Sequence, residues 1–348
     1  MSTGILKRSS GALVLFIILV LNGFSQVKDK STVRFVFYNV ENFFDTNDDT
    51  TKQDNDFLPH GLMRWNHTRY TDKINSIYKV IAAIGEWDTP VIAGFCEIEK
   101  RSILKDLISQ TYLIKYDFGI IHEESDDIRG IDVCLIYRKD IIRLCFYRYI
   151  KPPDIRREAY KTRSVLYSKW LIAQDTIHIF LNHWPSRRGG VLAEESLRNN
   201  ISLMIKEKTD SILKSANGKA KIIVAGDFNC TPGDKEIYQL IGINRNKTAG
   251  EKALLVNLSE DAANKGIGTY KYQGHWEMID QVIVSNWFVG CTEGFYTDKN
   301  LSRVFNSDFL LKRDPSYPGF IPFPTYRGYS YQGGFSDHLP VILDLKER

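Results

Sequence analysis

The stretch KIIVAGDFN occupies residues 221–229 and joins a short apolar run to two polar residues, Asp227 and Asn229. Short runs rich in Val and Ile are typical of buried strands. Similar runs occur at six other places, residues 33–38, 91–96, 132–137, 176–181, 279–284 and 340–345. The sequence therefore predicts strands at all seven places, and almost every one of them ends in a chemically competent side chain.

Segments with the apolar spacing of a helix lie between these runs. Residues 70–84 place Ile74, Ile77, Val80, Ile81 and Ile84 on one face. Residues 102–108 and 193–213 show similar spacing. Strands that alternate with helices predict an α/β fold.

Two further segments qualify this expectation. Hairpin-like neighbours around residues 118–137 and 134–150 indicate antiparallel pairs, so we predict a mixed sheet rather than a purely parallel one. Residues 305–335 show no regular period and are rich in prolines and aromatic residues. We predict that this segment is an ordered, functional loop.

The first residues have the composition of a secretory signal peptide. Lys7 and Arg8 precede an apolar run over residues 12–21, and the small residues Gly23 and Ser25 follow it. The run is short for a membrane span. We expect cleavage near Ser25–Gln26, export to the periplasm or the medium, and no transmembrane anchor afterwards.

The remaining chain has the composition of one globular domain. The 348 residues are 43% hydrophobic and 25% charged, and no linker or repeat divides them. We therefore predict a single catalytic domain over residues 26–348, which we expect to be a monomer without a stable protein partner. The five cysteines are predicted to be small buried hydrophobic residues rather than a disulfide framework.

The net charge of the chain excludes a strong global field. The formal charge is +4. Removing residues 1–25 takes away Lys7 and Arg8 and no acid, which leaves +4 − 2 = +2. Any affinity for nucleic acid must therefore come from a local patch of the surface.

Polar side chains gather at the ends of six predicted strands. One such residue alone is usually a turn residue or a helix cap. Their joint occurrence favours a site at one end of a sheet. The candidates are Asn39 and Glu41 after the run at 33–38, Glu97 after 91–96, His183 after 176–181, Asp227 and Asn229 after 221–225, Asp280 within 279–284, and Asp337 and His338 before 340–345.

This set of side chains indicates phosphoester hydrolysis. Carboxylates and an amide, without a Cys/His quartet, suit Mg²⁺, with Mn²⁺ or Ca²⁺ as alternatives, rather than structural Zn²⁺. An acid beside an Asn can hold and deprotonate a water, and a carboxylate can orient each His. Acyl transfer is disfavoured because Ser336 adjoins Asp337 and no G-x-S-x-G motif occurs.

Six motifs in order resemble the endonuclease/exonuclease/phosphatase superfamily, which includes nucleases, bacterial sphingomyelinases and inositol polyphosphate 5-phosphatases. The resemblance covers roughly residues 33–346. It implies a four-layer α/β/β/α sandwich of two packed mixed β-sheets with outer helices and the site at one end. The motifs are FYNVEN at 37–42, GFCE at 94–97, NHWPS at 182–186, GDFN at 226–229, IDQV at 279–282 and SDHLP at 336–340.

The resemblance also assigns roles to the matching residues. Glu97 is expected to be the main metal carboxylate, with Asn39, Glu41 and Asp337 at or near the metal. Asp227 is expected to position or deprotonate the attacking water, with help from Asn229. Asp280 is expected to orient His338 toward the scissile phosphate. His183 is expected to face the phosphate too, either stabilising the pentacoordinate phosphorane or protonating the leaving oxygen.

Basic and aromatic residues near these motifs favour a nucleic acid substrate. Guanidinium groups suit phosphate, and a tyrosine can stack on a base. The candidates are Arg129, Arg187, Arg188, Arg198 and Tyr326. The residues leave open a phosphatase or phospholipid phosphodiesterase of the same fold. An inactive phosphate- or nucleic-acid-binding module is the alternative of another class.

Overall fold

The computed structural model describes Met1 and residues 32–86, 88–153, 161–187, 191–242 and 253–348. Residues Ser31–Arg348 form one compact unit. The predicted signal segment, apart from Met1, and Arg188 lie outside the described residues. No helix of the described residues has the length and apolar character needed to cross a bilayer.

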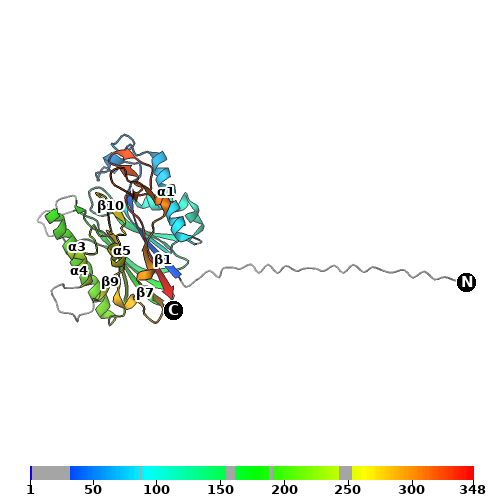
Figure 1. Ribbon diagram of the computed structural model, residues 1–348, viewed down its shortest axis with the longest axis vertical. Helices are drawn as coiled ribbons and strands as arrows, with labels where there is room; N and C mark the ends of the chain where they lie inside the picture. Colours follow the sequence, from blue (N-terminus) through cyan, green and yellow to red (C-terminus); the bar gives the residue numbers. More distant parts are fainter. Residues whose placement is uncertain (2–31, 87, 154–160, 188–190, 243–252) are drawn as a thin grey trace. The chain divides into compact units, whose positions relative to one another are not determined.

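Two large mixed β-sheets form the centre of this unit (Figure 1). Each sheet contains one parallel pair, β1 with β2 and β7 with β8, among antiparallel neighbours. The first sheet has the order β13–β19–β1–β2–β4–β3, with β14 also paired to β19, and the second has the order β5–β6–β7–β8–β12–β9. The strands of the first sheet are β1 (Thr32–Phe43), β2 (Ile92–Ile98), β3 (Phe118–Ile121), β4 (Asp132–Arg138), β13 (Phe295–Tyr296), β14 (Ser302–Val304) and β19 (Val341–Glu347); those of the second are β5 (Arg143–Ile150), β6 (Val165–Ile172), β7 (Asp175–His183), β8 (Lys221–Asp227), β9 (Leu255–Asn257) and β12 (Asp280–Ser285). All seven predicted strands are confirmed.

Helices cover the outer face of each sheet, and Figure 1 shows α1 and the pair α3 and α4 on opposite sides of the strands. Buried residues of α1 and α2 share one apolar cluster with β1, β2 and β4, and those of α3 and α4 share another with β7 and β8. A third cluster joins the two sheets, with Phe37 of β1 and Leu181 of β7 among its members. The predicted four-layer sandwich is thus confirmed. The helices are α1 (His67–Gly85), α2 (Arg101–Ser109), α3 (Val191–Ser215), α4 (Lys235–Ile241) and the short α5 (Glu260–Asn264).

The apolar face predicted over residues 70–84 is the buried face of α1. Each of its five aliphatic residues is at most 2% exposed. The helix begins after Asn66, whose side chain accepts a hydrogen bond from the Arg69 backbone N–H. Apolar spacing, capping and burial therefore agree on this helix.

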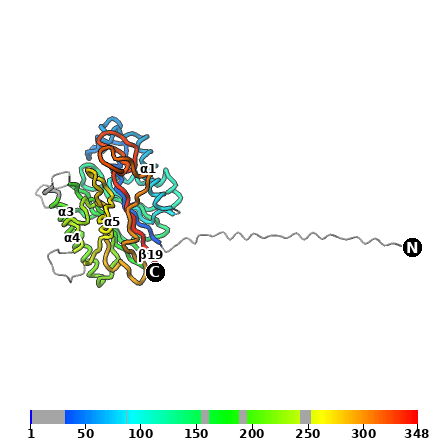
Figure 2. The backbone as a smooth tube through the Cα atoms, viewed as in Figure 1, coloured from blue at the N-terminus to red at the C-terminus, as the bar shows by residue number. Residues whose placement is uncertain are grey.

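The two ends of the described domain pair with each other. Strand β1 runs antiparallel to β19, with Phe37 opposite Val341, and Figure 2 shows the blue and red strands side by side. Residues 336–340 precede β19, so this pairing brings them to the end of β1. There the Ser336 hydroxyl donates to the Asn39 carbonyl oxygen at 2.7 Å.

One of the two predicted hairpins is correct. Strands β3 and β4 pair antiparallel, with Gly119 opposite Tyr137. The second, around residues 134–150, is wrong because β4 and β5 lie in different sheets. The chain turns after Arg138, buries Ile142 between the sheets, and enters the second sheet, where β5 pairs with β6 instead.

Residues 305–335 are more regular than the sequence indicates. They contain the hairpin of β15 (Leu311–Arg313) and β16 (Phe320–Pro322), and that of β17 (Tyr326–Arg327) and β18 (Ser330–Tyr331). A third small hairpin, β10 (Tyr270–Tyr272) with β11 (His275–Glu277), precedes β12. Strands of two or three residues are too short to show a period of two.

The prediction for the cysteines is correct for four of the five. All five thiols are free, and Cys145 is exposed on the edge strand β5. Its apolar neighbours indicate a strand correctly, but they do not show that β5 lies at the edge of its sheet.

Candidate active site

Three strands of the second sheet align three of the predicted site residues. His183 at the end of β7 lies opposite Asp227 of β8, and Asp280 of β12 lies opposite Asp227 on its other side. Gly226 permits the close approach of β7 and β8: its φ is +150°, and a Cβ there would lie 2.2 Å from the Asn182 carbonyl oxygen. The glycine of the GDFN motif is therefore required by the backbone.

The first sheet brings Glu97 to the same place through irregular strand ends. The pairing of β1 with β2 is interrupted between Asn39 and Phe43. Glu97 (φ 65°) and Asn42 (φ 46°) adopt left-handed backbone conformations there, which are uncommon for residues other than glycine and concentrate at functional sites. The Asn42 backbone N–H donates to Glu97 Oε2 at 2.8 Å, which fixes the carboxylate.

Asp227 is the centre of the site. Asn39 Nδ2 donates to Asp227 Oδ2 at 3.1 Å, and the Asn229 backbone N–H donates to Asp227 Oδ1 at 2.9 Å. Asp227 Oδ2 also lies 3.7 Å from His183 Nε2 and 4.0 Å from His338 Nε2. Burial raises the pKa of Asp227 to about 7; the Asp280 carboxylate acts in the same direction, and His338 opposes it.

His338 is held as a cation. Its Nδ1 lies 2.7 Å from Asp280 Oδ2, and its ring packs against Tyr270 with ring centroids 5.0 Å apart. Burial alone lowers the pKa of His338, but Asp280, followed by Asp337 and Asp227, raises it well above the ordinary value. His338 is therefore protonated at neutral pH.

His183 has the opposite protonation state. Burial, followed by the positive charge of Arg163, holds the pKa of His183 well below its ordinary range. Its Nε2 lies 3.7 Å from Glu97 Oε1, and its buried Nδ1 has no hydrogen-bond partner among the described residues. One histidine of the site is therefore neutral and the other is charged.

The sequence did not single out Arg163, which lines the same cleft. Its Nε donates to the His183 carbonyl oxygen at 3.3 Å and its Nη2 to that of Trp184 at 2.8 Å. Its Nη1 pairs with Asp127 Oδ2 at 2.9 Å. The one local signal is a polar triplet, Thr162, Arg163 and Ser164, directly before the apolar strand β6.

The donor set fits a hard divalent cation. Glu97 Oε1 and Asp227 Oδ2 each lie 3.7 Å from His183 Nε2, so two carboxylates face one small space. Asp227, Asp280 and His338 also form a compact group of possible ligands. Oxygen-rich sets of this kind suit Mg²⁺, Mn²⁺ or Ca²⁺.

Asn39 and Asp337, two of the predicted metal residues, lie beside this group. Asn39 is 1% exposed and its Oδ1 accepts from the Glu41 backbone N–H at 3.0 Å. Asp337 Oδ1 lies 3.9 Å from His338 Nε2, and Asp337 lines the cleft.

Glu41, the other predicted metal residue, is engaged elsewhere. Its Oε2 accepts from the Thr325 backbone N–H at 2.6 Å, and its Oε1 accepts from that of Tyr326 at 2.9 Å. The buried Lys73 ammonium donates to the Thr325 hydroxyl and to the Phe335 carbonyl oxygen, and it opposes the effect of burial on the pKa of Glu41. Glu41 and Lys73 thus attach the segment around Thr325 to the body of the domain, a contact that the sequence did not reveal.

The predicted substrate-binding residues occupy different environments. Arg129 lines the cleft and its side chain is 45% exposed. Arg187 also lines it, but pairs with Asp234 at 2.8 Å and lies 3.8 Å from Glu277. The cleft has a volume of about 470 Å³.

Arg198 and Tyr326 do not line this cleft. Arg198 is 4% exposed, donates to the Pro185 carbonyl oxygen and lies 3.7 Å from Glu236. The Tyr326 hydroxyl donates to the Met63 carbonyl oxygen. Neither side chain is presented to a phosphate bound among the candidate catalytic residues.

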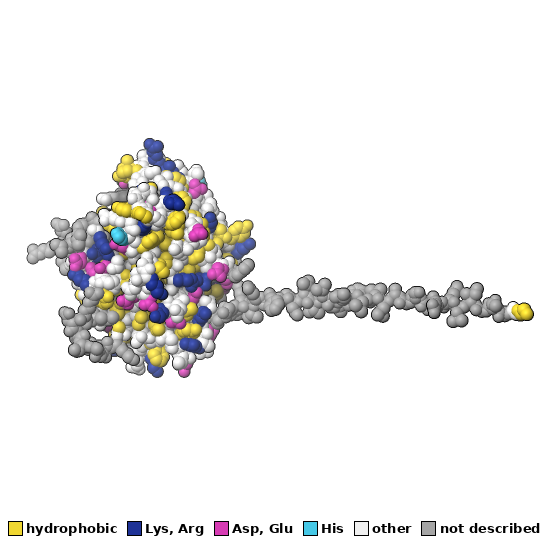
Figure 3. All heavy atoms as spheres, viewed as in Figure 1, with side chains coloured by type: hydrophobic (Ala, Val, Ile, Leu, Met, Phe, Trp, Pro, Cys, Tyr) yellow, Lys and Arg dark blue, Asp and Glu magenta, His cyan; other side chains and the backbone are white. Residues whose placement is uncertain are grey.

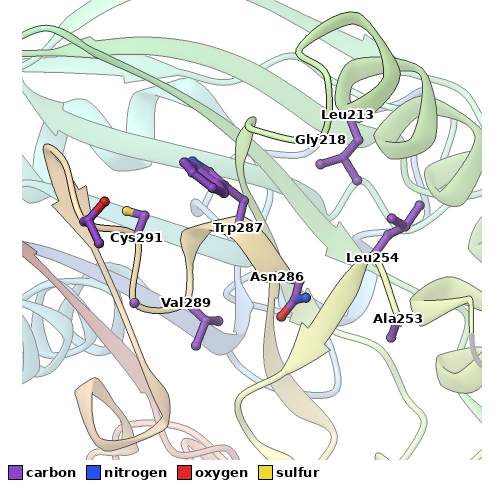
Figure 4. A pocket seen from close by; sticks show the side chains of 10 residues that line it. Leu213, Gly218, Ala253, Leu254, Asn286, Trp287, Val289 and Cys291 are labelled. Atoms are coloured by element: carbon purple, nitrogen blue, oxygen red, sulfur yellow. The ribbon is translucent and has the colours of Figure 1, made fainter. Parts of the chain in front are cut away.

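Another pocket, of about 350 Å³, shares no residue with the cleft. Leu213, Leu254, Trp287 and Val289 line it, and Figure 4 shows these apolar side chains around the space. Figure 3 shows basic and acidic side chains interspersed over one face of the molecule, in keeping with the small net charge.

The fold is a two-sheet sandwich whose one end carries carboxylates, a neutral histidine and a charged histidine. This combination defines a phosphoester hydrolase. A profile of the endonuclease/exonuclease/phosphatase family matches residues 34–347. The chain belongs to this family of phosphoester hydrolases. Enzymes of the family depend on a divalent metal.

Solved structures show the same fold. TDP2 of D. rerio in complex with a single-strand DNA product is 14% identical, with a TM-score of 0.55, over 91% of this chain and 99% of that one. A mannosyl-6-phosphatase of Bacteroides thetaiotaomicron is 16% identical, with a TM-score of 0.54, over 90% and 99%. The human Nocturnin catalytic domain is 14% identical, with a TM-score of 0.53, over 91% and 94%. A comparison with curated protein sequences finds no significant match.

Proposed function

We propose that this chain is a divalent-metal-dependent phosphodiesterase that hydrolyses DNA or RNA. The observation that carries the proposal is the position of Asp227 between a neutral His183 and a cationic His338. A carboxyl group with a pKa of about 7 is matched to proton transfer near neutral pH.

Glu97 is the principal residue for holding the metal, with Asp337 and Asn39 beside it. A bound Mg²⁺, Mn²⁺ or Ca²⁺ supplies positive charge that polarises the phosphoryl oxygens. Glu97 suits this role because Asn42 fixes one carboxylate oxygen while the other faces the space shared with Asp227 and His183.

Asp227 removes the proton from the attacking water. Hydrogen bonds from Asn39 and Asn229 hold its carboxylate in place. The water oxygen forms a bond to phosphorus, its proton passes to Asp227, and the bond from phosphorus to the leaving oxygen breaks with the electron pair on that oxygen. Deprotonated Asp227 is required, so the rate of this step falls as pH decreases through the pKa of Asp227, which burial raises.

The two histidines stabilise the transition state differently. His338 presents its charged Nε2–H to a non-bridging phosphoryl oxygen, while Asp280 holds the other ring nitrogen. His183 is neutral, so it donates a hydrogen bond and does not supply a proton as an imidazolium. Of its two expected roles, stabilisation of the phosphorane is the better supported.

Arg129 supports a nucleic acid substrate because its guanidinium, which is 45% exposed and shares the Asp127 carboxylate with Arg163, lies at the cleft, where a phosphate beside the scissile one would pass. The charge-balanced Arg187, however, favours a substrate with few phosphates as a second candidate. We therefore carry a phosphomonoesterase acting on a small phosphate ester as the alternative activity.

The mature protein, residues 26–348, is proposed to act as an exported monomeric enzyme. The basic residues, apolar run and small residues before Gln26 support export. N-terminal sequencing of the protein recovered from outside the cytoplasm would show Gln26 first. Recovery only from the cytoplasm with Met1 intact would contradict export.

A substrate panel tests the activity. The mature protein is incubated with plasmid DNA, RNA, bis(4-nitrophenyl) phosphate and mannose 6-phosphate in Mg²⁺, Mn²⁺ or Ca²⁺, with Glu97→Gln as the control. We expect cleavage of the diesters, and a loss of about 100-fold or more in the control. Release of phosphate from the monoester alone would favour the phosphatase, and binding of DNA without hydrolysis would favour the inactive module.

A further inference from the structure

A second groove, of about 290 Å³, adjoins the catalytic cleft. Tyr270 and Asp337 line both spaces. The Tyr270 ring also contacts the ring of His338. A group esterified to a phosphate at His338 therefore has a direct path into this groove.

One wall of the groove is the hairpin of β10 and β11 with the segment it packs against. The Tyr317 ring packs closely on Gly274 in the hairpin turn. A Cβ on Gly274 would lie only 3.0 Å from this ring. Lys271 donates to the Pro318 carbonyl oxygen at 2.9 Å and pairs with Asp314 at 3.1 Å. These contacts hold the Tyr317 ring in place while 44% of the residue remains exposed.

A second part of the groove lining is attached to the body of the domain. Pro324, Tyr326 and Arg327 belong to this part. The backbone N–H of Tyr326 donates to Glu41, which lies in β1. The groove is therefore formed by contacts within the protein, and binding would not have to order it.

The charges of the groove balance. Its lining includes two basic residues, Lys271 and Arg327, and two acidic residues, Asp314 and Asp337. The Lys271–Asp314 pair is almost completely buried, with side chains 3% and 5% exposed. Binding of several phosphates needs cations that are not already neutralised, so this groove suits an uncharged group with polar edges.

We propose that the groove binds the nucleoside attached to the scissile phosphate, with its base stacked on Tyr317. This inference rests on the proposed nuclease activity and names the recognition element for its substrate. Tyrosine rings are sequence-tolerant stacking surfaces for bases. The volume of about 290 Å³ is just below the roughly 300–1,000 Å³ of small-molecule sites, so the groove suits one nucleoside and not a duplex.

Two chromogenic diesters test the proposal, methyl 4-nitrophenyl phosphate and the 4-nitrophenyl ester of thymidine 5′-monophosphate. Both release 4-nitrophenolate, and they differ in the second ester group, which is methyl in one and the nucleoside in the other. We expect Tyr317→Leu to lower kcat/KM for the nucleoside ester by about fivefold to 150-fold, the range for loss of one stacked base. It should leave the simple diester within about twofold of the parent.

Matched variants separate stacking from folding. Tyr317→Phe keeps the ring and should retain the preference for the nucleoside ester. Tyr112→Ala removes a tyrosine that is 65% exposed and lines neither space, and should change neither rate. Thymidine 5′-monophosphate should inhibit Tyr317→Leu less strongly than the parent, while inhibition by inorganic phosphate stays the same.

The outcomes distinguish the inference from the function it rests on. No metal-dependent cleavage of either diester would remove the proposed function. Cleavage of both with equal losses in Tyr317→Leu, or with no loss, would overturn the nucleoside site alone. A Tyr317-dependent preference for mannose 6-phosphate over the nucleoside ester would overturn it in favour of a sugar.

Discussion

Asp280 Oδ2 lies 2.7 Å from His338 Nδ1, and this contact joins a strand of the second sheet to the segment before the last strand of the first. The carboxylate makes the largest contribution to raising the pKa of the imidazole, against the effect of burial. Catalysis through a charged His338 therefore depends on a residue that need not touch the substrate.

Asp280→Asn should move the alkaline limb of the kcat/KM profile to lower pH. The amide oxygen can still accept from Nδ1–H, but the negative charge is gone, so the pKa of His338 falls and the cation is lost earlier as pH rises. We expect a shift of at least about one pH unit. Asp261→Asn, in a surface pair with Lys299, is the control, and an unchanged limb would refute the role of Asp280.

The Asp280–His338 pair also makes the free energy of unfolding depend on pH, in a defined direction. The folded pKa of His338 is raised, so the contribution of the pair is complete below the unfolded value of about 6.5. It is lost as pH rises through the folded pKa. Thermal unfolding should therefore show a smaller loss of stability between pH 6 and pH 9 in Asp280→Asn than in the parent.

His183→Ala should slow the hydrolysis of good and poor leaving groups by similar factors. A neutral imidazole donates a hydrogen bond in the transition state but is a poor source of a full proton. Diesters of 4-nitrophenol and of an alkyl alcohol provide the comparison, and we expect losses within about threefold of each other. A loss confined to the alkyl diester would restore the general-acid role.

Glu41→Gln should destabilise the domain without weakening metal binding. Glu41 accepts two backbone hydrogen bonds, and Gln can accept only through its one oxygen, which leaves a buried N–H facing an amide NH₂. We expect a decrease of about 1–3 kcal/mol in the free energy of unfolding. Calorimetry should give a Mg²⁺ dissociation constant within about twofold of the parent.

Glu97→Gln is the matched comparison, because it should weaken metal binding without destabilising the domain. The amide oxygen can still accept from the Asn42 N–H, so stability should change little, whereas metal binding should weaken. Hydrogen exchange over residues 325–331 should increase only in Glu41→Gln. If Glu41→Gln weakened metal binding as much as Glu97→Gln, Glu41 would be a metal ligand as the family resemblance implies.

Arg163→Lys should lower kcat by about 100-fold with little change in KM. The guanidinium contacts the carbonyl oxygens of His183 and Trp184 and the Asp127 carboxylate together, and an ammonium cannot reproduce this planar geometry. Small displacements of catalytic groups have effects of about this size. Arg143→Lys, at an exposed position of β5, is the matched control.

Charge and geometry can be separated at this position by an NMR titration of His183. Arg163→Lys keeps the positive charge, so the pKa of His183 should stay low. A rise of the pKa together with the loss of rate would show that the ammonium does not reproduce the charge effect of the guanidinium on His183, and the loss of rate would then not be assigned to positioning alone.

The strand ends were predictable because the signal is local. An apolar run followed by an acid, an amide or a histidine lies within ten residues of sequence, and this pattern is sufficient to locate Glu97, Asp227 and His183. The fold followed from the same runs together with the family motifs. Both sheets and their outer helices agree with that prediction.

The partners of these residues were not predictable because they are distant in sequence. Lys73 contacts Thr325, 252 positions away, and Arg163 contacts Asp127, 36 positions away. Such contacts depend on how the sheets and loops stack, which no periodicity encodes. The wrong hairpin at residues 134–150 has the same cause, since local spacing does not tell which sheet a strand joins.

The division of the site between the two sheets also determines when the site is complete during folding. Glu97 and Asn39 come from the first sheet, whereas His183, Asp227 and Asp280 come from the second. Neither sheet alone contains both the proposed metal carboxylate and the proposed base. The two groups meet only when the sheets have packed against each other, so a chain that has formed one sheet alone lacks the complete proposed site.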